Sequence, residues 1–207
     1  MRVAVLASGS GTNLQSLIQR CRAPAPVQIA LVASNRPDAG ALQRAREAGI
    51  SSHVLADPAD GQSLLTTLEE CDIDLVVLAG YLKLVPQDVV VRFAGRMINI
   101  HPALLPSFGG AGMYGSKVHD AVIRSGATVT GVTVHLVSEE YDRGPIVAQW
   151  PVPVSSDDTP ETLGRRVLAV EHQILPEVVI NAARAGGVTR MFPTSDSWEE
   201  VAICPAH

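Results

Sequence analysis

The sequence predicts an α/β fold, built as a three-layer, doubly wound and mostly parallel sheet. Short apolar runs alternate along the chain with segments whose apolar residues recur at helical spacing, and glycine-rich turns separate the two kinds of segment. With 46% apolar and 18% charged side chains among 207 residues, the chain can bury one sizeable core. We expect a single domain over residues 1–187 and a tail over residues 188–207.

The first strand is predicted over residues 3–7, an apolar run that a glycine-rich turn follows. Apolar residues at positions 14, 17, 18 and 21 then form the stripe of a helix. Thr12 and Gln15 have the spacing of a capping box, which predicts that this helix starts at Thr12 or Asn13. The next apolar run predicts a second strand over residues 27–33.

Two further helices and two further strands are predicted next. A helix over residues 38–48 ends at Gly49, because glycine is typical of a helix terminus, and a short strand follows over residues 52–55. Leucines at positions 64, 65 and 68 indicate another helix. The run over residues 75–78 is the most apolar of all, which predicts a central strand.

The carboxyl-terminal half begins with a predicted strand over residues 97–100 and a predicted helix over residues 114–125. Two more apolar runs predict strands over residues 131–138 and 145–154. An acidic turn at residues 139–144 would join these two strands as a hairpin-like pair.

A long helix is predicted over residues 159–185. Pro160 suits its first turn, and Gly186 suits the position just after its end. We expect Pro176 to kink or split this helix, because proline removes a hydrogen bond and clashes with the preceding turn.

The composition disfavours several classes of function. A net charge of −5, 4% aromatic residues and the lack of a basic run argue against nucleic-acid binding. The longest uncharged stretch, residues 97–116, contains prolines and polar residues unsuited to a membrane span, and residues 3–7 are too short for a signal-peptide core. Three scattered cysteines and no histidine pair at ligand spacing predict neither disulfides nor a metal site. We therefore expect a cytoplasmic protein.

The turn at residues 8–13, Ser-Gly-Ser-Gly-Thr-Asn, lies between the first strand and the first helix. Glycines let the backbone turn tightly, and free N–H groups at a helix start attract anions; a plain tight turn is the alternative. NAD is disfavoured, because Leu14 stands where a third glycine is needed and no acid ends the second strand, although Arg36 leaves an NADP ribose open. A sugar monophosphate fits best.

Asn99 and His101 stand two residues apart at the end of the predicted fifth strand, so their side chains would share one face of the sheet. Pro102 favours an extended His101. An amide that donates to an oxyanion and an imidazole that moves a proton suit acyl chemistry. The alternative is a loop asparagine beside a histidine whose hydrogen bonds the main chain satisfies.

If the acidic turn at residues 139–144 folds over His101, one of its carboxylates would orient the imidazole and raise its pKa. Each of these acids alone is more simply a solvated surface group. Three other residues have simple structural interpretations: His135 as a core histidine with one polar partner, Glu171 as part of a solvated helix face, and Lys83 as a surface lysine at a strand end.

Five segments together resemble the phosphoribosylglycinamide formyltransferases, folate-dependent enzymes of purine synthesis. They are residues 6–15, 78–83, 99–106, 130–135 and 142–146, and the resemblance extends from residue 1 to about residue 186. Asn-x-His-Pro-x-Leu-Leu-Pro and the later Asp-x-Gly-Pro are shared with the wider formyltransferase family, whereas Ser-Gly-x-Gly-x-Asn-Leu-Gln points to the glycinamide ribonucleotide branch. The resemblance implies a formyltransferase-like fold with a Rossmann-type amino-terminal half.

The resemblance also implies roles for individual residues. The 5′-phosphate of the substrate would be held by Gly11, Thr12 and Asn13, and its ribose hydroxyls by Glu171. The catalytic residues would be Asn99, His101 and Asp142. The folate would lie between Lys83, Leu84 and Val85 on one side and a loop with Val137, Glu140 and Tyr141 on the other, with its glutamate tail near Lys83.

The implied reaction is direct formyl transfer from 10-formyltetrahydrofolate, a co-substrate, to the amine of 5′-phosphoribosylglycinamide, without a metal and without an acyl-enzyme. A monomer or homodimer would carry it out. An NADP-linked oxidoreductase and a non-catalytic folate or nucleotide binder stay open as alternatives, while a methionyl-tRNA enzyme is disfavoured because no basic carboxyl-terminal domain follows. Two departures from many relatives are the glycine-rich residues 107–113 and the lack of a second basic residue for the folate tail over residues 57–68.

Overall fold

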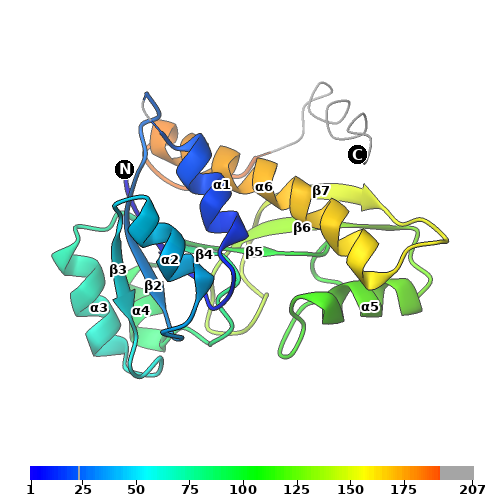
Figure 1. Ribbon diagram of the computed structural model, residues 1–207, viewed down its shortest axis with the longest axis horizontal. Coiled ribbons are helices and arrows are strands. Elements are labelled where there is room, and N and C mark those ends of the chain that lie inside the picture. The colour runs from blue at the N-terminus through cyan, green and yellow to red at the C-terminus, as the bar shows by residue number, and fades with distance from the viewer. Residues whose placement is uncertain (23, 192–207) are drawn as a thin grey trace.

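The computed structural model describes residues 1–22 and 24–191. Within them lies a seven-stranded sheet of order β3-β2-β1-β4-β5-β6-β7 (Figure 1). The strands are β1 (Arg2–Leu6), β2 (Gln28–Ser34), β3 (Ser51–Val54), β4 (Leu75–Leu78), β5 (Met97–His101), β6 (Val129–Leu136) and β7 (Ile146–Pro153). The helices are α1 (Thr12–Arg20), α2 (Gly40–Glu47), α3 (Gly61–Glu70), α4 (Gln87–Arg92), α5 (Ser116–Arg124) and α6 (Pro160–Ala185).

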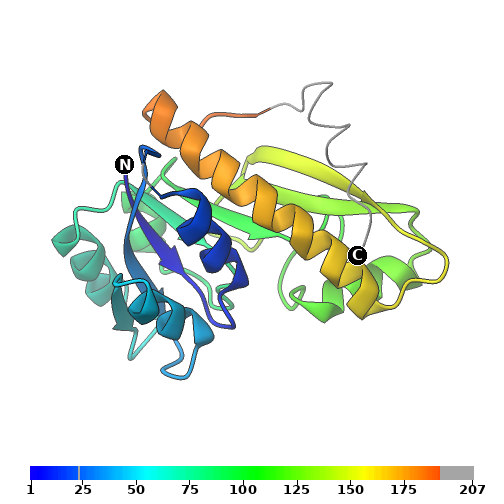
Figure 2. The same cartoon turned by 45° about the horizontal axis from the view of Figure 1, so that its top comes forward.

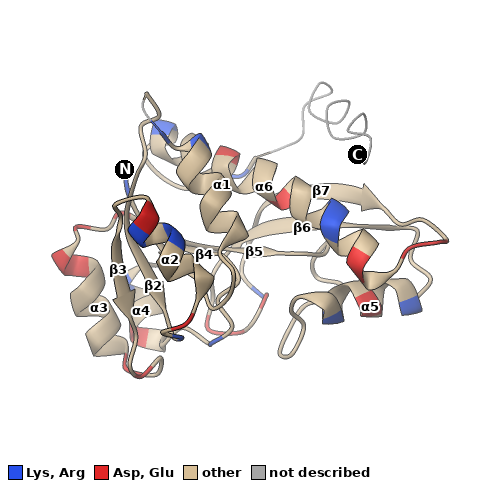
Figure 3. Cartoon of the chain, in the orientation of Figure 1, with Lys and Arg blue, Asp and Glu red and all other residues tan. Residues whose placement is uncertain are grey.

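The predicted fold class is confirmed. Strands β1 to β5 pair in parallel, while β5–β6 and β6–β7 pair antiparallel, so the sheet is mostly parallel. The strand predicted over residues 75–78 is β4, which stands fourth of the seven and is buried along its whole length. Figure 3 shows charged residues of both signs on the helices and loops, and Arg2 is the one charged residue within the seven strands.

Two apolar clusters make the core, one on each face of the sheet. In β1, Val3 and Val5 point into the first cluster, which α1, α2 and α6 cover, while Ala4 and Leu6 point into the second, beneath α3 and α4. This alternation follows from the two-residue period of a strand. Figure 2 shows α6 crossing one face of the sheet beside α1, and the two helices are in contact.

The helix α1 starts at Thr12, as predicted, but the predicted capping box is absent. Gly11 is the N-cap, with a left-handed φ of 74°, and no side-chain hydrogen bond caps the helix. Gln15 accepts a hydrogen bond from Arg44 (3.0 Å) rather than completing a capping box with Thr12. Because no side chain occupies them, the N–H groups of the first turn stay free, which strengthens the expectation of an anion site.

Two of the other helices differ from the sequence analysis. The helix α4 has no counterpart among the predicted elements; its six residues include consecutive valines, which favour a strand. Pro176 does not split α6, which runs as one helix of 26 residues. Pro176 is buried beside Ile174 and Leu175, so apolar packing stabilises the helix despite the missing hydrogen bond.

Residues 192–207, and with them most of the predicted tail and Cys204, lie outside the described part of the chain. Before that point, Met191 donates a backbone hydrogen bond to Val147 (2.8 Å). In the described part of the chain, no helix combines the length and apolar character needed to cross a membrane.

The order of the strands determines where a ligand can bind. The chain leaves β1 toward β2 on one side and later returns to β4 on the other side, so the carboxyl ends of β1 and β4 diverge into a crevice. Ser8 joins the two ends: its N–H donates to Gly80 (3.0 Å), and its hydroxyl accepts from the N–H of Leu82 (2.9 Å).

Candidate active site

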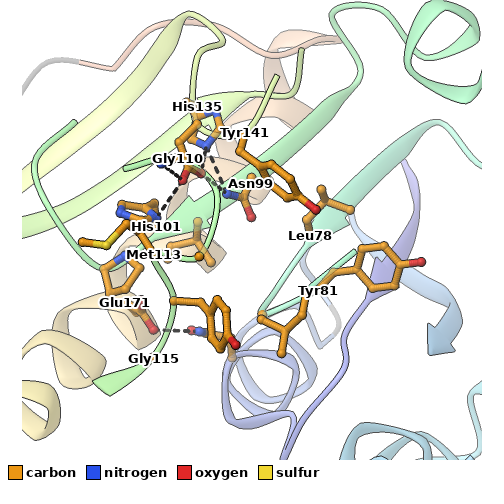
Figure 4. A pocket seen from close by; sticks show the side chains of 18 of the residues that line it. Leu78, Tyr81, Asn99, His101, Gly110, Met113, Gly115, His135, Tyr141 and Glu171 are labelled. Carbon is orange, nitrogen blue, oxygen red and sulfur yellow. Dashed lines mark hydrogen bonds and ion pairs between the residues drawn. The ribbon is translucent and has the colours of Figure 1, made fainter. Parts of the chain in front are cut away.

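A cavity of about 710 Å³ opens at this edge of the sheet, bounded by α5, α6 and the loops that follow β4, β5 and β6. Figure 4 shows His135, Asn99 and His101 gathered at one end with Tyr141 beside Asn99, Glu171 at another end, and Tyr81 across from His101. The sequence-predicted site residues that line it are Asn13, Lys83, Leu84, Val85, Asn99, His101, Val137, Glu140, Tyr141, Asp142 and Glu171. Gly11 and Thr12 are not among the lining residues.

Asn99 belongs to a hydrogen-bond network that starts from strand pairing. In the antiparallel β5–β6 pair, Asn99 stands opposite His135, so both side chains leave the same face of the sheet. His135 Nδ1 lies 2.8 Å from the carbonyl of Leu136, and its Nε2 lies 3.0 Å from Asn99 Nδ2 and 3.5 Å from Asp142 Oδ1. Asn99 Nδ2 donates a hydrogen bond to Asp142 Oδ1, 3.3 Å away.

Asp142 links Asn99 to His101. Its Oδ2 accepts from the N–H of Gly110 (2.8 Å) and lies 3.5 Å from His101 Nδ1. Burial alone would raise the pKa of the Asp142 carboxyl, but His135, His101 and the Gly110 N–H outweigh it and hold the pKa below its ordinary value. The carboxylate is therefore ionised at neutral pH.

The glycine-rich segment fits closely over Asp142. A Cβ on Gly109 would lie 3.1 Å from the Asp142 Cβ and 2.5 Å from a methyl of Leu105. Asp142 itself has a positive φ of 57°, a conformation that Asp and Asn tolerate better than most residues. The extra glycines after β5 thus let this loop approach the carboxylate.

His101 is 3% exposed, and acceptors face both of its nitrogens. Nε2 lies 2.9 Å from the carbonyl of Phe108, and Nδ1 faces Asp142. Burial lowers the pKa of His101, while Asp142 and the Phe108 carbonyl oppose that shift without overcoming it. Asp142 thus raises the pKa as expected from the acidic turn, but desolvation is the larger effect and the net pKa of His101 is lower than that of a free imidazole.

The glycine-rich turn after β1 is held in shape by α2. The left-handed φ of Gly11 suits glycine, and a Cβ there would lie 2.7 Å from the Cα of Ala41. The N–H of Ala41 donates to the carbonyl of Gly9 (3.1 Å), and Arg44 donates to that of Ser10 (2.8 Å). These contacts fix a turn whose following helix has uncapped N–H groups at its start.

Glu171 connects this turn to α6. Its carboxylate accepts a hydrogen bond from Asn13 Nδ2 (2.8 Å), and the residue is 7% exposed. Burial raises the pKa of Glu171 to about 7, and the hydrogen bond from Asn13 only partly opposes this. The interpretation of Glu171 as part of a solvated helix face is wrong, because α6 packs that face against α1.

The opposite side of the cavity is more apolar and more open. Leu84 and Tyr141 are exposed although both are large apolar side chains, and Val85 beside them is buried. Lys83, next to Leu84 in the sequence, is exposed, as expected for a lysine near a strand end. An exposed apolar surface of this kind is typical of a ligand-binding wall.

Two lining residues were missed by sequence reasoning as parts of the site. His135 is buried as expected, but it contacts Asn99, Asp142 and the Leu136 carbonyl rather than one polar partner. His135 stands opposite Asn99 because β5 and β6 are neighbours in the sheet, a pairing that the sequence analysis did not predict. His119, on α5, gave no signal in the sequence, because its place in the wall depends on how α5 packs against α6.

Comparison with known proteins agrees with this geometry. Residues 1–179 match the model of the formyl transferase family. The chain is 45% identical over 186 residues to the chloroplastic phosphoribosylglycinamide formyltransferase of Arabidopsis thaliana, covering 86% of this chain and 64% of that protein. It is 40% identical to phosphoribosylglycinamide formyltransferase of Haemophilus influenzae, covering 86% and 85% of the two chains.

A solved structure gives the same result. The crystal structure of phosphoribosylglycinamide formyltransferase from Anaplasma phagocytophilum superposes with a TM-score of 0.84 at 37% identity, covering 94% of each chain. The family match spans most of the sequence, and the fold and the strand order bring the shared motifs to one cavity. The chain therefore belongs to the formyl transferase family.

Proposed function

We propose that this protein transfers the formyl group of 10-formyltetrahydrofolate to the amine of 5′-phosphoribosylglycinamide in de novo purine biosynthesis. We further propose that residues 1–187 work as one domain and that the protein acts in the cytoplasm as a monomer or homodimer. The observation that carries the proposal is the position of Asn99, His101 and Asp142 in one cavity with Glu171 on one wall and an exposed apolar surface on the other. The similarity to proteins named phosphoribosylglycinamide formyltransferase supports the proposal.

The amine substrate would bind between α1 and α6. A phosphate monoester suits the uncapped N–H groups that follow Gly11, since helix amino termini attract anions. The Oδ1 atom of Asn13 is buried without a partner among the described residues, so a ligand hydroxyl there would satisfy it. Glu171 offers carboxylate oxygens next to Asn13, as two ribose hydroxyls would require.

The folate would bind along the apolar wall. Leu84, Val85, Val137 and Tyr141 offer the apolar contact that a pterin and a benzoyl ring need. Lys83 is exposed and lines the cavity next to Leu84, so its ammonium group suits the carboxylates of a glutamate tail. These features fit the co-substrate.

The reaction requires the amine to attack the formyl carbon, which turns the formyl oxygen into an oxyanion. Asn99 would donate an amide hydrogen to that oxygen, giving up its longer contact with Asp142 (3.3 Å). His101 Nδ1 would accept the proton that the amine loses, because Asp142 stabilises the imidazolium. The same proton would then pass to the folate nitrogen as its bond to carbon breaks, so tetrahydrofolate leaves without an acyl-enzyme.

The test is an assay of folate deformylation by the purified protein, with and without the ribonucleotide. The proposal expects tetrahydrofolate release that depends on the amine and is matched by formylated product. Release without the amine would indicate a hydrolase. Protection from unfolding by NADP and not by folates would support the oxidoreductase alternative, although the exposed Arg36 already pairs with Asp38 (2.9 Å).

A further inference from the structure

An imidazole in the cavity wall has no assigned role. His119, on α5, is 7% exposed, and its Nδ1 is buried without a hydrogen-bond partner among the described residues. The ring packs against Gly164 on α6, where a Cβ would lie 3.0 Å from His119 Cδ2 and 3.3 Å from Nε2. Figure 1 shows α5 lying against the amino-terminal half of α6. A glycine at position 164 of α6 therefore leaves the space that the imidazole of His119 occupies.

The two nitrogens of His119 differ in their surroundings. Burial lowers the pKa of His119, and the nearby His101 lowers it further, so the ring is neutral and carries one proton. A buried N–H without a partner is rarer in proteins than an unsatisfied acceptor, which favours a bare Nδ1. The proton then resides on Nε2, the nitrogen through which the ring can meet the cavity that it lines.

The neighbours of His119 indicate which substrate it meets. Gly164 and Glu171 are seven positions apart on α6, so they share one face of the helix, separated by roughly 10 Å along its axis. Both line the cavity. If Glu171 holds the ribose, His119 lies farther along the same wall of the cavity, where the rest of the amine substrate would extend. His119 is also close enough to His101 for their charges to interact.

We propose that His119 binds the amine substrate as a neutral hydrogen-bond donor, with its Nε2–H directed at the glycinamide carbonyl oxygen. This inference rests on the proposed function, because it names the ligand of the same cavity. A ligand oxygen at this point would position the amine beside Asn99 and His101 before transfer.

The first test is His119→Leu, which removes the donor and keeps an apolar side chain. Since the change also removes an unsatisfied buried polar atom, we expect unfolding temperature to stay the same or rise. We expect the Kd and KM for the ribonucleotide to increase about 3- to 10-fold, as for loss of one hydrogen bond, and the KM for the folate to be unchanged. His119→Gln, which retains an N–H donor, should restore most of the affinity.

Two further variants separate binding from packing. His172 on α6 also has an unpartnered buried Nε2, but it does not line the cavity, so His172→Leu should leave ribonucleotide affinity unchanged. Gly164→Ala should weaken ribonucleotide binding by displacing the ring of His119, although alanine favours the helix. Equal affinity of wild type and His119→Leu for the ribonucleotide, measured by calorimetry without folate, would overturn the inference while leaving the function intact.

A failure of the proposed function gives a different result. In that case the wild-type protein itself would neither bind the ribonucleotide nor deformylate the folate in its presence. Equal losses for both substrates in His119→Leu, together with a lower unfolding temperature, would show a structural role only and would also overturn the inference.

Discussion

Replacing Asp142 with asparagine perturbs the centre of the site with little change in shape. The two side chains are nearly isosteric, and asparagine tolerates the positive φ of 57° found at this position. The carboxamide oxygen can replace only one of the two carboxylate oxygens. With that oxygen accepting from Gly110, the amide NH2 would face the donor group of Asn99.

The main loss is the negative charge beside His101. Unit charges 3.5 Å apart interact by about 5 kcal/mol at an effective dielectric constant of about 20. If that interaction stabilises the imidazolium formed during transfer, its loss corresponds to a decrease of roughly 3000-fold in kcat. We expect binding of the ribonucleotide to change little, because Glu171 and Asn13 are untouched.

The assay is steady-state folate deformylation at saturating substrates, with calorimetry for ribonucleotide binding and circular dichroism for folding. Asp120→Asn, the same chemical change on the exposed side of α5, is the matched control and should leave kcat unchanged. A folded Asp142→Asn variant with kcat within about fivefold of wild type would refute the reasoning, because no charge at this position would then be needed.

Three other variants test separate parts of the site. Gly11→Ala should lower the free energy of unfolding by about 2 kcal/mol or more, because it adds backbone strain at φ 74° and a Cβ only 2.7 Å from the Cα of Ala41. Gly9→Ala, where the new Cβ meets open space, should leave the free energy of unfolding unchanged, and denaturant unfolding measures both variants. Glu171→Gln should abolish a loss of wild-type stability of roughly 3 kcal/mol as pH rises from about 4 to 7. Over that range the unfolded carboxyl loses its proton, whereas the folded one, with a pKa of about 7, keeps it; identical pH profiles of the two proteins would contradict this. Asn99→Ala should fold normally and lose roughly 100- to 1000-fold in kcat, as for other oxyanion donors, and a near-normal rate with saturating substrates would remove Asn99 from the mechanism.

Local patterns were enough to predict the parallel half of the fold. Apolar runs such as residues 75–78 are long enough to be buried on both faces, and their spacing leaves room only for crossover helices. The two-residue period of a strand was also enough to predict that Asn99 and His101 share a face. These features depend only on residues close together in the sequence, so they can be predicted from the sequence alone.

Properties that depend on tertiary packing were not predictable in the same way. Asp142 comes within reach of His101 only because the β6–β7 pair folds back beside β5, and the resemblance to a family, not the spacing, identified it. The direction of the His101 pKa shift depends on how deeply the ring is buried. Glu171 is followed by His172 and Gln173, polar residues that suggest exposure, yet α6 buries Glu171.

The central claim is that Asn99, His101 and Asp142 serve a direct transfer between two bound substrates. The most direct measurement is a single turnover with isotopically labelled formyl folate and excess ribonucleotide, quenched in acid and separated into protein and small molecules. We predict that label lost from the folate equals label gained by the ribonucleotide at every time point, with none on the protein. Label retained on the protein, or released as formate before the amine is added, would contradict the account.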